Sequence, residues 1–128
     1  TLNPGGVRLG TAEIYSVVEK FKEIQESIVI GQSWENDIRI ILFIVLNKDY
    51  NLTDEIKEKI KNAIKTNASP RHVPSKIISI SEIPKTKNGK LVELAVKQTV
   101  EGEIIKNLEA LANPDSLKQF KNIKELNE

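Results

Sequence analysis

A run of seven consecutive apolar residues, Ile40–Leu46, constrains the fold of this chain more strongly than any other feature. Most of its residues are β-branched or aromatic, and polar and apolar positions do not alternate along it. These properties predict a β-strand buried on both faces, which needs covering elements on each side of its sheet. The run is far shorter than the ~20 residues that span a bilayer, so no membrane association is predicted.

Helices with one apolar face are predicted on both sides of this strand in the sequence. The first begins at Thr11, and its apolar residues follow the helical spacing i, i+3, i+4 and i+7 at Ile14, Val17, Val18 and Phe21. The second begins near Thr53 and repeats the pattern at Ile56, Ile60, Ala63 and Ile64. Two more are expected, from Leu91 to about Gly102 and from Asp115 to Phe120.

Short β-branched segments predict further strands, and turn-forming residues separate them. The strands are expected at Val7–Leu9, Ile28–Ile30 and Ile77–Ile80, with a turn at Trp34–Asp37 and a proline-containing loop at Ala68–Pro74. The predicted fold class is α+β, an α/β sandwich in which a small, mostly three-stranded sheet is flanked by helices. The length of 128 residues predicts a single domain.

The composition excludes several classes of function. The chain has no cysteine, which excludes disulfides, thiolate metal ligands and a cysteine nucleophile. The one histidine, His72, lies between two prolines and is interpreted as structural. Nineteen basic residues against 18 acidic ones argue against a general nucleic-acid binder. Thr1–Gly6 lacks the pattern of a signal peptide, and a cytoplasmic location is expected.

Two loops carry more functional residue types than a connecting role requires. In Gly5–Gly10, glycines allow close approach to a ligand, and Arg8 could grip a phosphate with two hydrogen bonds. In Pro84–Lys90, three lysines surround Asn88-Gly89, a dipeptide that favours a tight turn. Spacing alone leaves simpler alternatives open, namely a flexible linker and a solvated hairpin tip.

Both loops resemble motifs of the adenylate-forming superfamily, which contains acyl-CoA synthetases. Gly5–Ile14 resembles its glycine–x–arginine…glutamate–isoleucine motif, and Pro84–Lys90 resembles its Pro-Lys-Thr-x-x-Gly-Lys motif. The resemblance covers the whole chain and implies the mobile C-terminal domain of a larger ligase. Thr1–Arg8, Arg71–Ser75, Val92–Lys97 and Asn113–Leu117 are similar to the acetoacetyl-CoA synthetase branch. Glu93 stands near a position where many members have a basic residue, which weakens a more general assignment.

The resemblance implies roles for individual residues. Lys90 would be the adenylation lysine, which offsets charge while a carboxylate attacks the α-phosphate of ATP. After a domain rotation, Gly5 and Gly6 would line the tunnel for the pantetheine arm of CoA, and Arg8 would lie near a phosphate. Lys65 falls roughly where relatives place a basic residue near the CoA nucleotide.

The resemblance also implies what the chain lacks. No phosphate loop, adenine pocket or acyl pocket is found in the sequence, and the N-terminal adenylation domain of the same protein would supply all three. ATP, CoA and Mg²⁺ are the implied cofactors, and they would be bound mainly by that absent domain. The family's hinge residue would lie just before Thr1. The 128 residues alone are therefore expected to be inactive.

Alternatives remain open at this point. The acid could be acetoacetate, acetate, propionate or another short carboxylic acid, because the acyl pocket is not in the sequence. A non-catalytic module that binds a nucleotide or a protein partner would also fit two basic, glycine-containing loops. A reading frame with a phosphate loop upstream of Thr1 would favour the ligase, and a start codon there would favour the module.

Overall fold

A single three-stranded sheet organises the protein. The computed structural model of the chain describes residues 10–84, 89–103, 113–121 and 123–127. Within them the sheet has the order β1-β2-β3, with bounds β1 (Ile24–Trp34), β2 (Asp37–Leu46) and β3 (Lys76–Ser79). β1 and β2 are antiparallel, whereas β2 and β3 are parallel. This confirms the predicted α+β class and a sheet flanked by helices. The predicted strand Val7–Leu9 lies outside the described residues.

The central strand β2 feeds two separate cores, as its uninterrupted apolar run predicts. Ile41, Phe43 and Val45 belong to the core on one face of the sheet. Their neighbours Ile40, Leu42 and Ile44 belong to the core on the other face. All six are buried, because successive side chains of a strand point to opposite faces and both faces are covered.

The hairpin between β1 and β2 confirms the predicted turn. Glu35 and Asn36 form its two-residue loop, with φ of 50° and 63°, and Trp34 pairs with Asp37 across it. Two successive positive φ values are typical of the turn that matches the twist of a hairpin. β1 is nevertheless longer than the predicted Ile28–Ile30, because its pairing with β2 continues through polar residues that an apolar pattern does not reveal.

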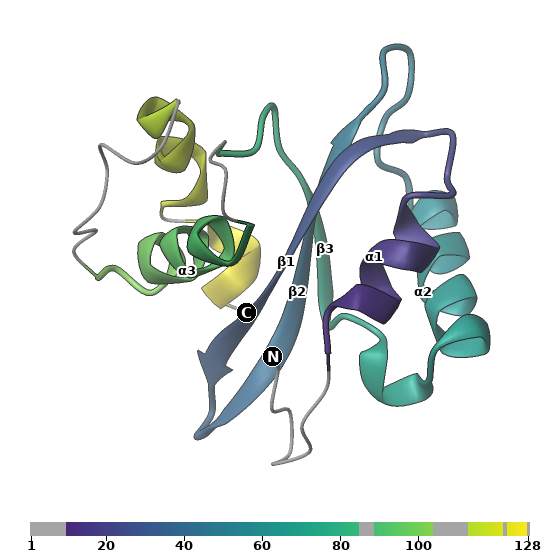
Figure 1. Cartoon of the computed structure of the whole chain (residues 1–128), viewed down its shortest axis with the longest axis horizontal. Helices are drawn as coiled ribbons and strands as arrows, with labels where there is room; N and C mark the ends of the chain where they lie inside the picture. The colour runs from purple at the N-terminus through teal and green to yellow at the C-terminus, as the bar shows by residue number, and fades with distance from the viewer. Residues whose placement is uncertain (1–9, 85–88, 104–112, 122, 128) are drawn as a thin grey trace.

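Helices α1 (Ala12–Val18) and α2 (Asp54–Asn67) cover one face of the sheet (Figure 1). The prediction that α1 continues to Phe21 is wrong. The N–H groups of Lys20 and Phe21 donate to carbonyls three residues back, and this tighter turn ends the helix. Phe21 still packs against the core of this face. At the start of α2, Thr53 Oγ1 accepts a hydrogen bond from the Ile56 N–H at 3.2 Å, as expected of an N-cap.

Helix α3 (Gly89–Val100) and the 3₁₀ helices η4 (Pro114–Phe120) and η5 (Lys124–Asn127) cover the opposite face (Figure 1). Helix α3 begins two residues before its predicted start at Leu91. The predicted tail helix is confirmed, with 3₁₀ geometry. Its last residue, Phe120, meets the ring of Phe43 edge-to-face, with 4.8 Å between the ring centroids. A further 3₁₀ turn, η2 (Pro70–His72), lies in the predicted loop Ala68–Pro74.

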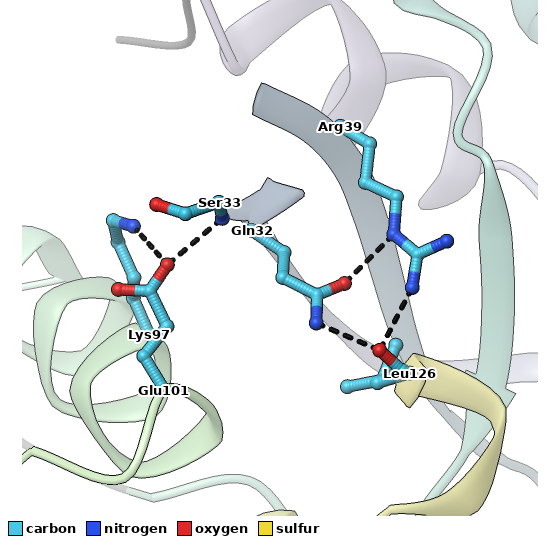
Figure 2. A network of polar contacts seen from close by, with 6 residues as sticks. All are labelled: Gln32, Ser33, Arg39, Lys97, Glu101 and Leu126. Atoms are coloured by element: carbon cyan, nitrogen blue, oxygen red, sulfur yellow. Dashed lines mark hydrogen bonds and ion pairs between the residues drawn. The ribbon is translucent and has the colours of Figure 1, made fainter. Parts of the chain in front are cut away.

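Polar contacts tie the end of the chain to the hairpin (Figure 2). The backbone carbonyl of Leu126 accepts hydrogen bonds from Gln32 Nε2 and Arg39 Nη2, both at 2.9 Å. Arg39 Nε also donates to Gln32 Oε1 at 2.8 Å, and the guanidinium lies 3.9 Å from the centre of the Trp34 ring. These bonds satisfy a backbone acceptor near the C-terminal end and fix η5 over the sheet.

Tyr15 joins three elements at the outer edge of β1. Its hydroxyl accepts a hydrogen bond from the Val29 N–H at 2.9 Å and donates one to Glu93 Oε2 at 2.5 Å. Burial raises the pKa of Tyr15 well above that of an exposed tyrosine, and the hydrogen bond to Glu93 acts in the same direction. One phenol therefore connects α1, β1 and α3 across the two layers.

No helix in the described ranges is long and apolar enough to cross a membrane.

Substitution of Phe43 tests the two-sided core. Phe43→Ala should lower the free energy of unfolding by ~3–5 kcal/mol, because the cavity opens beneath Phe120 in a fully buried layer. Urea denaturation followed by circular dichroism measures this change. Tyr50→Ala is the matched control, since Tyr50 is 37% exposed and should change stability by less than ~0.5 kcal/mol. Equal effects from both substitutions would contradict the burial of Phe43.

The hydroxyl of Tyr15 should make stability depend on alkaline pH. Its folded-state pKa is raised, so its contribution is complete below about pH 10, the unfolded value, and is lost as pH rises further. Urea denaturation between about pH 9 and pH 11 should show a flatter profile for Tyr15→Phe than for the wild type. Tyr50→Phe should retain the wild-type slope. A Tyr15→Phe profile as steep as the wild type would contradict the raised pKa.

Candidate functional site

The described ends of the two motif loops line one hollow of about 430 Å³ at the edge of β1. Its lining includes Thr11, which directly follows the glycine loop, and Pro84, where the lysine motif begins. Val92 and Glu93 of α3 line it as well. The remaining lining residues are Tyr15, Ser27, Ile28 and Ile83. A second hollow, of about 390 Å³, shares Tyr15, Ser27 and Ile83 with the first.

The lysine motif leads from a buried anchor into a helix. Pro84 is fully buried, and α3 begins at Gly89, so the backbone of Lys90 lies in the first turn of that helix. The alternative of a hairpin tip is wrong, because a helix rather than a strand follows the motif. Residues 85–88, with the predicted Asn88-Gly89 turn, and the side chain of Lys90 lie outside the described part of the structure.

Glu93, which follows the lysine motif in α3, has an internal role. It is half-buried, and its carboxylate accepts the hydrogen bond from Tyr15. A basic side chain at this position could not accept that bond, and the phenol would lose its acceptor. Glu93 and Tyr15, which both line the hollow, therefore hold α3 to α1.

Of the other candidate residues, the structure describes Lys65, which does not line this hollow. Gly5, Gly6 and Arg8 lie outside the described residues. Lys65 is exposed in the last turn of α2, and α2 packs on the opposite face of the sheet from α3. The sheet thus separates Lys65 from the helix that carries Lys90.

Gly10, the last glycine of the first loop, is exposed and not crowded by its surroundings. Among the described residues, a Cβ built there would meet the end of the flexible Glu13 side chain, at 3.2 Å. The described part of the loop therefore gives no steric reason for glycine at position 10.

Some polar residues of this region could not be found from the sequence. In the sequence, Tyr15 stands beside the apolar face of α1. Its position does not indicate which groups its hydroxyl bonds to. Asn113 and Gln119 belong to the tail, yet their side chains bond to the loop Ser81–Ile83 that precedes the lysine motif. Nothing in the local sequence pattern indicates these contacts, which span 30 and 38 positions.

A metal site is not formed by this part of the protein. The described residues contain no group of three or more histidine, cysteine, aspartate or glutamate side chains that could hold a metal ion.

The sequence is similar to known proteins along nearly its whole length. The model of the family described as AMP-binding enzyme C-terminal domain matches residues 13–90. Acetoacetyl-coenzyme A synthetase from Rhizobium meliloti (strain 1021) is 55% identical over 126 residues, which is 98% of this chain and 19% of the relative. Acetoacetyl-CoA synthetase from Caenorhabditis elegans is 46% identical over 122 residues, 94% of this chain and 17% of the relative.

Solved structures share the fold. Acetoacetyl-CoA synthetase from Streptomyces lividans superimposes with a TM-score of 0.82 and 35% sequence identity, over 95% of this chain and 19% of that chain. An acyl-CoA synthetase from Brucella canis gives a TM-score of 0.63 and 25% identity, over 70% of this chain and 17% of that chain.

The chain spans about one fifth of the length of these relatives. The resemblance seen in the motifs is confirmed by the family match and by the fold. The chain belongs to the AMP-binding enzyme C-terminal domain family.

Proposed function

We propose that this chain is the mobile C-terminal domain of an ATP-dependent acetoacetate–CoA ligase. The similarity that carries the proposal is the 55% identity to the acetoacetyl-coenzyme A synthetase of Rhizobium meliloti, across 98% of this chain. The substrates are acetoacetate, ATP and CoA, and the reaction has two half-reactions with an acyl-adenylate between them. A cytoplasmic location is part of the proposal.

In the first half-reaction Lys90 is the adenylating residue. Attack of a carboxylate on the α-phosphate of ATP brings two anions together and releases pyrophosphate. The ammonium group of Lys90 offsets this negative charge, and a preorganised cation does so most effectively where water is excluded. The position of Lys90 in the first turn of α3 supports this role, because a packed helix fixes its backbone.

In the second half-reaction the glycine loop replaces the lysine at the shared active site. Gly5 and Gly6 line a narrow passage for the pantetheine arm, where a side chain would obstruct it. Arg8 neutralises a phosphate, and Lys65 lies near the CoA nucleotide. The placement of α2 and α3 on opposite faces supports a domain that presents different faces in turn.

The partner is the N-terminal adenylation domain of the same protein, which supplies the pockets for ATP and for the acid. Acyl specificity is therefore set outside this chain. Acetate or propionate as the preferred acid is the alternative, and the same assay decides between them.

Replacement of Lys90 tests the first half-reaction in the full-length protein. ATP–pyrophosphate exchange with acetoacetate should fall by about 10²–10³-fold in Lys90→Ala, as expected when one preorganised charge-stabilising group is removed. Lys87→Ala, in the same motif, is the matched control and should keep most of the activity. Persistent exchange in Lys90→Ala would contradict the role, and a preference for acetate would change the substrate but keep the reaction class.

A side chain in the glycine loop should block the second half-reaction selectively. Gly6→Val should leave ATP–pyrophosphate exchange close to the wild type and lower the rate of acetoacetyl-CoA formation, because it narrows the passage for CoA. Gly10→Ala is the control, since its Cβ would meet only a flexible side chain. Equal loss of both half-reactions in Gly6→Val would speak against a role specific to CoA.

A further inference from the structure

The tail of the chain holds the loop that leads into the lysine motif. Oε1 of Gln119 accepts hydrogen bonds from the backbone N–H and the hydroxyl of Ser81, both at 2.8 Å. Nε2 of the same amide donates to the backbone carbonyl of Glu82 and to that of Ser116, the latter at 3.0 Å. One planar amide thus pairs with both a donor and an acceptor of the loop backbone, much as a neighbouring strand would.

A second amide completes this contact. Nδ2 of Asn113 donates to the backbone carbonyl of Ile83 at 3.2 Å and to Glu82 Oε2 at 3.4 Å. The backbone of Asn113 is itself held in place, because its backbone carbonyl accepts a hydrogen bond from Ser116 Oγ at 2.7 Å at the start of η4. We name Asn113 and Gln119 the tail amides.

The tail amides stand on a rigid base. Leu117 and Phe120, on either side of Gln119 in η4, are 4% and 0% exposed, and both belong to the core beneath α3. The amides are therefore displayed from a packed element, which lowers the entropic cost of holding the loop.

The loop needs these partners because it has no secondary structure of its own. Residues 80–84 follow β3 without forming a helix or strand, so their backbone groups must find other hydrogen bonds or water. The same core that carries η4 also contains Val92 and Val96 of α3. The tail therefore contacts both described sides of the lysine motif, by hydrogen bonds before it and by apolar packing after it.

The tail half of this contact lies outside the part of the chain that the family model matches. The family match covers residues 13–90, whereas Asn113 and Gln119 lie beyond it. The tail amides are thus an addition to the domain that the family match describes.

We propose that Gln119 and Asn113 are positioning residues for the adenylation half-reaction. They fix the backbone at Ser81–Ile83 and thereby the path on which the chain enters the lysine motif. The proposal rests on the function proposed above for Lys90. The glycine loop leads into α1, which packs on the other face of the sheet, so we expect the CoA half-reaction to depend less on the tail amides.

The experiment replaces the hydrogen-bonding group but keeps the size of the side chain. In the full-length protein, Gln119→Leu should lower kcat for ATP–pyrophosphate exchange with acetoacetate by about ten- to a hundredfold, as a misplacement of about 1 Å does. KM for ATP should change little. Formation of acetoacetyl-CoA from supplied acetoacetyl-adenylate and CoA should keep its wild-type rate. Asn113→Ala should act in the same direction.

Lys118→Ala is the matched control, and two outcomes would overturn the proposal. Lys118 adjoins Gln119, is exposed, and its described ion pair is with Asp115 in the same helix. It should leave both half-reactions unchanged. Unaltered exchange in Gln119→Leu would overturn the positioning role. An equal fall in both half-reactions would do the same, because it would indicate a general loss of stability.

Amide hydrogen exchange separates a failure of this proposal from a failure of the proposed function. Peptides that contain Ser81 should exchange faster in Gln119→Leu than in the wild type, whichever acid the full-length protein activates. If the wild type shows no ATP–pyrophosphate exchange with any short acid, the proposed function fails, and the positioning of Lys90 fails with it. Faster amide hydrogen exchange at Ser81 in Gln119→Leu would then support only the contact between Gln119 and the loop. Unchanged amide hydrogen exchange there would overturn that contact as well.

Discussion

The burial of β2 on both faces is the constraint on which the other layers depend. A strand whose every residue from Ile40 to Val45 is buried cannot exist without cover on each side, and burial of such side chains is the main favourable contribution to folding. The chain meets this requirement with α1 and α2 on one face and α3, η4 and η5 on the other. The result is a domain with two separate cores, one on each face of the sheet.

Two polar contacts hold these layers together where apolar packing cannot. At the outer edge of β1, the Tyr15 hydroxyl bonds to Val29 and to Glu93, and so joins α1 to α3 around the strand. Near the turn of the hairpin, the Leu126 carbonyl receives bonds from Gln32 and Arg39 (Figure 2). Apolar contacts are non-directional and allow layers to slide, whereas hydrogen bonds between fixed groups set one arrangement.

The sequence predicts what local patterns encode and misses what depends on distant partners. Ile40–Leu46 and the helix at Thr53 are found because their periodicity and capping are local. The extent of β1 is missed because its outer residues are stabilised by pairing with β2, and the end of α1 is missed because Phe21 stays apolar after the helix stops. The lysine and glycine motifs are recognised by resemblance, whereas the bond between Glu93 and Tyr15 joins residues 78 positions apart and needs the fold.

The tail amides illustrate why fixing the position of a loop and stabilising the whole fold are separate effects. A hydrogen bond within the protein replaces bonds that the same groups make to water in the unfolded chain. Each such bond therefore contributes only about 0.5–1.5 kcal/mol to folding. Loss of Gln119 from an element already anchored by Leu117 and Phe120 would therefore change the stability of the domain little. A charge-stabilising lysine, by contrast, is sensitive to displacements of about 1 Å, because its effect depends on geometry at the reacting atoms. The positioning role that we propose for the tail amides therefore requires only a small contribution from them to the stability of the fold.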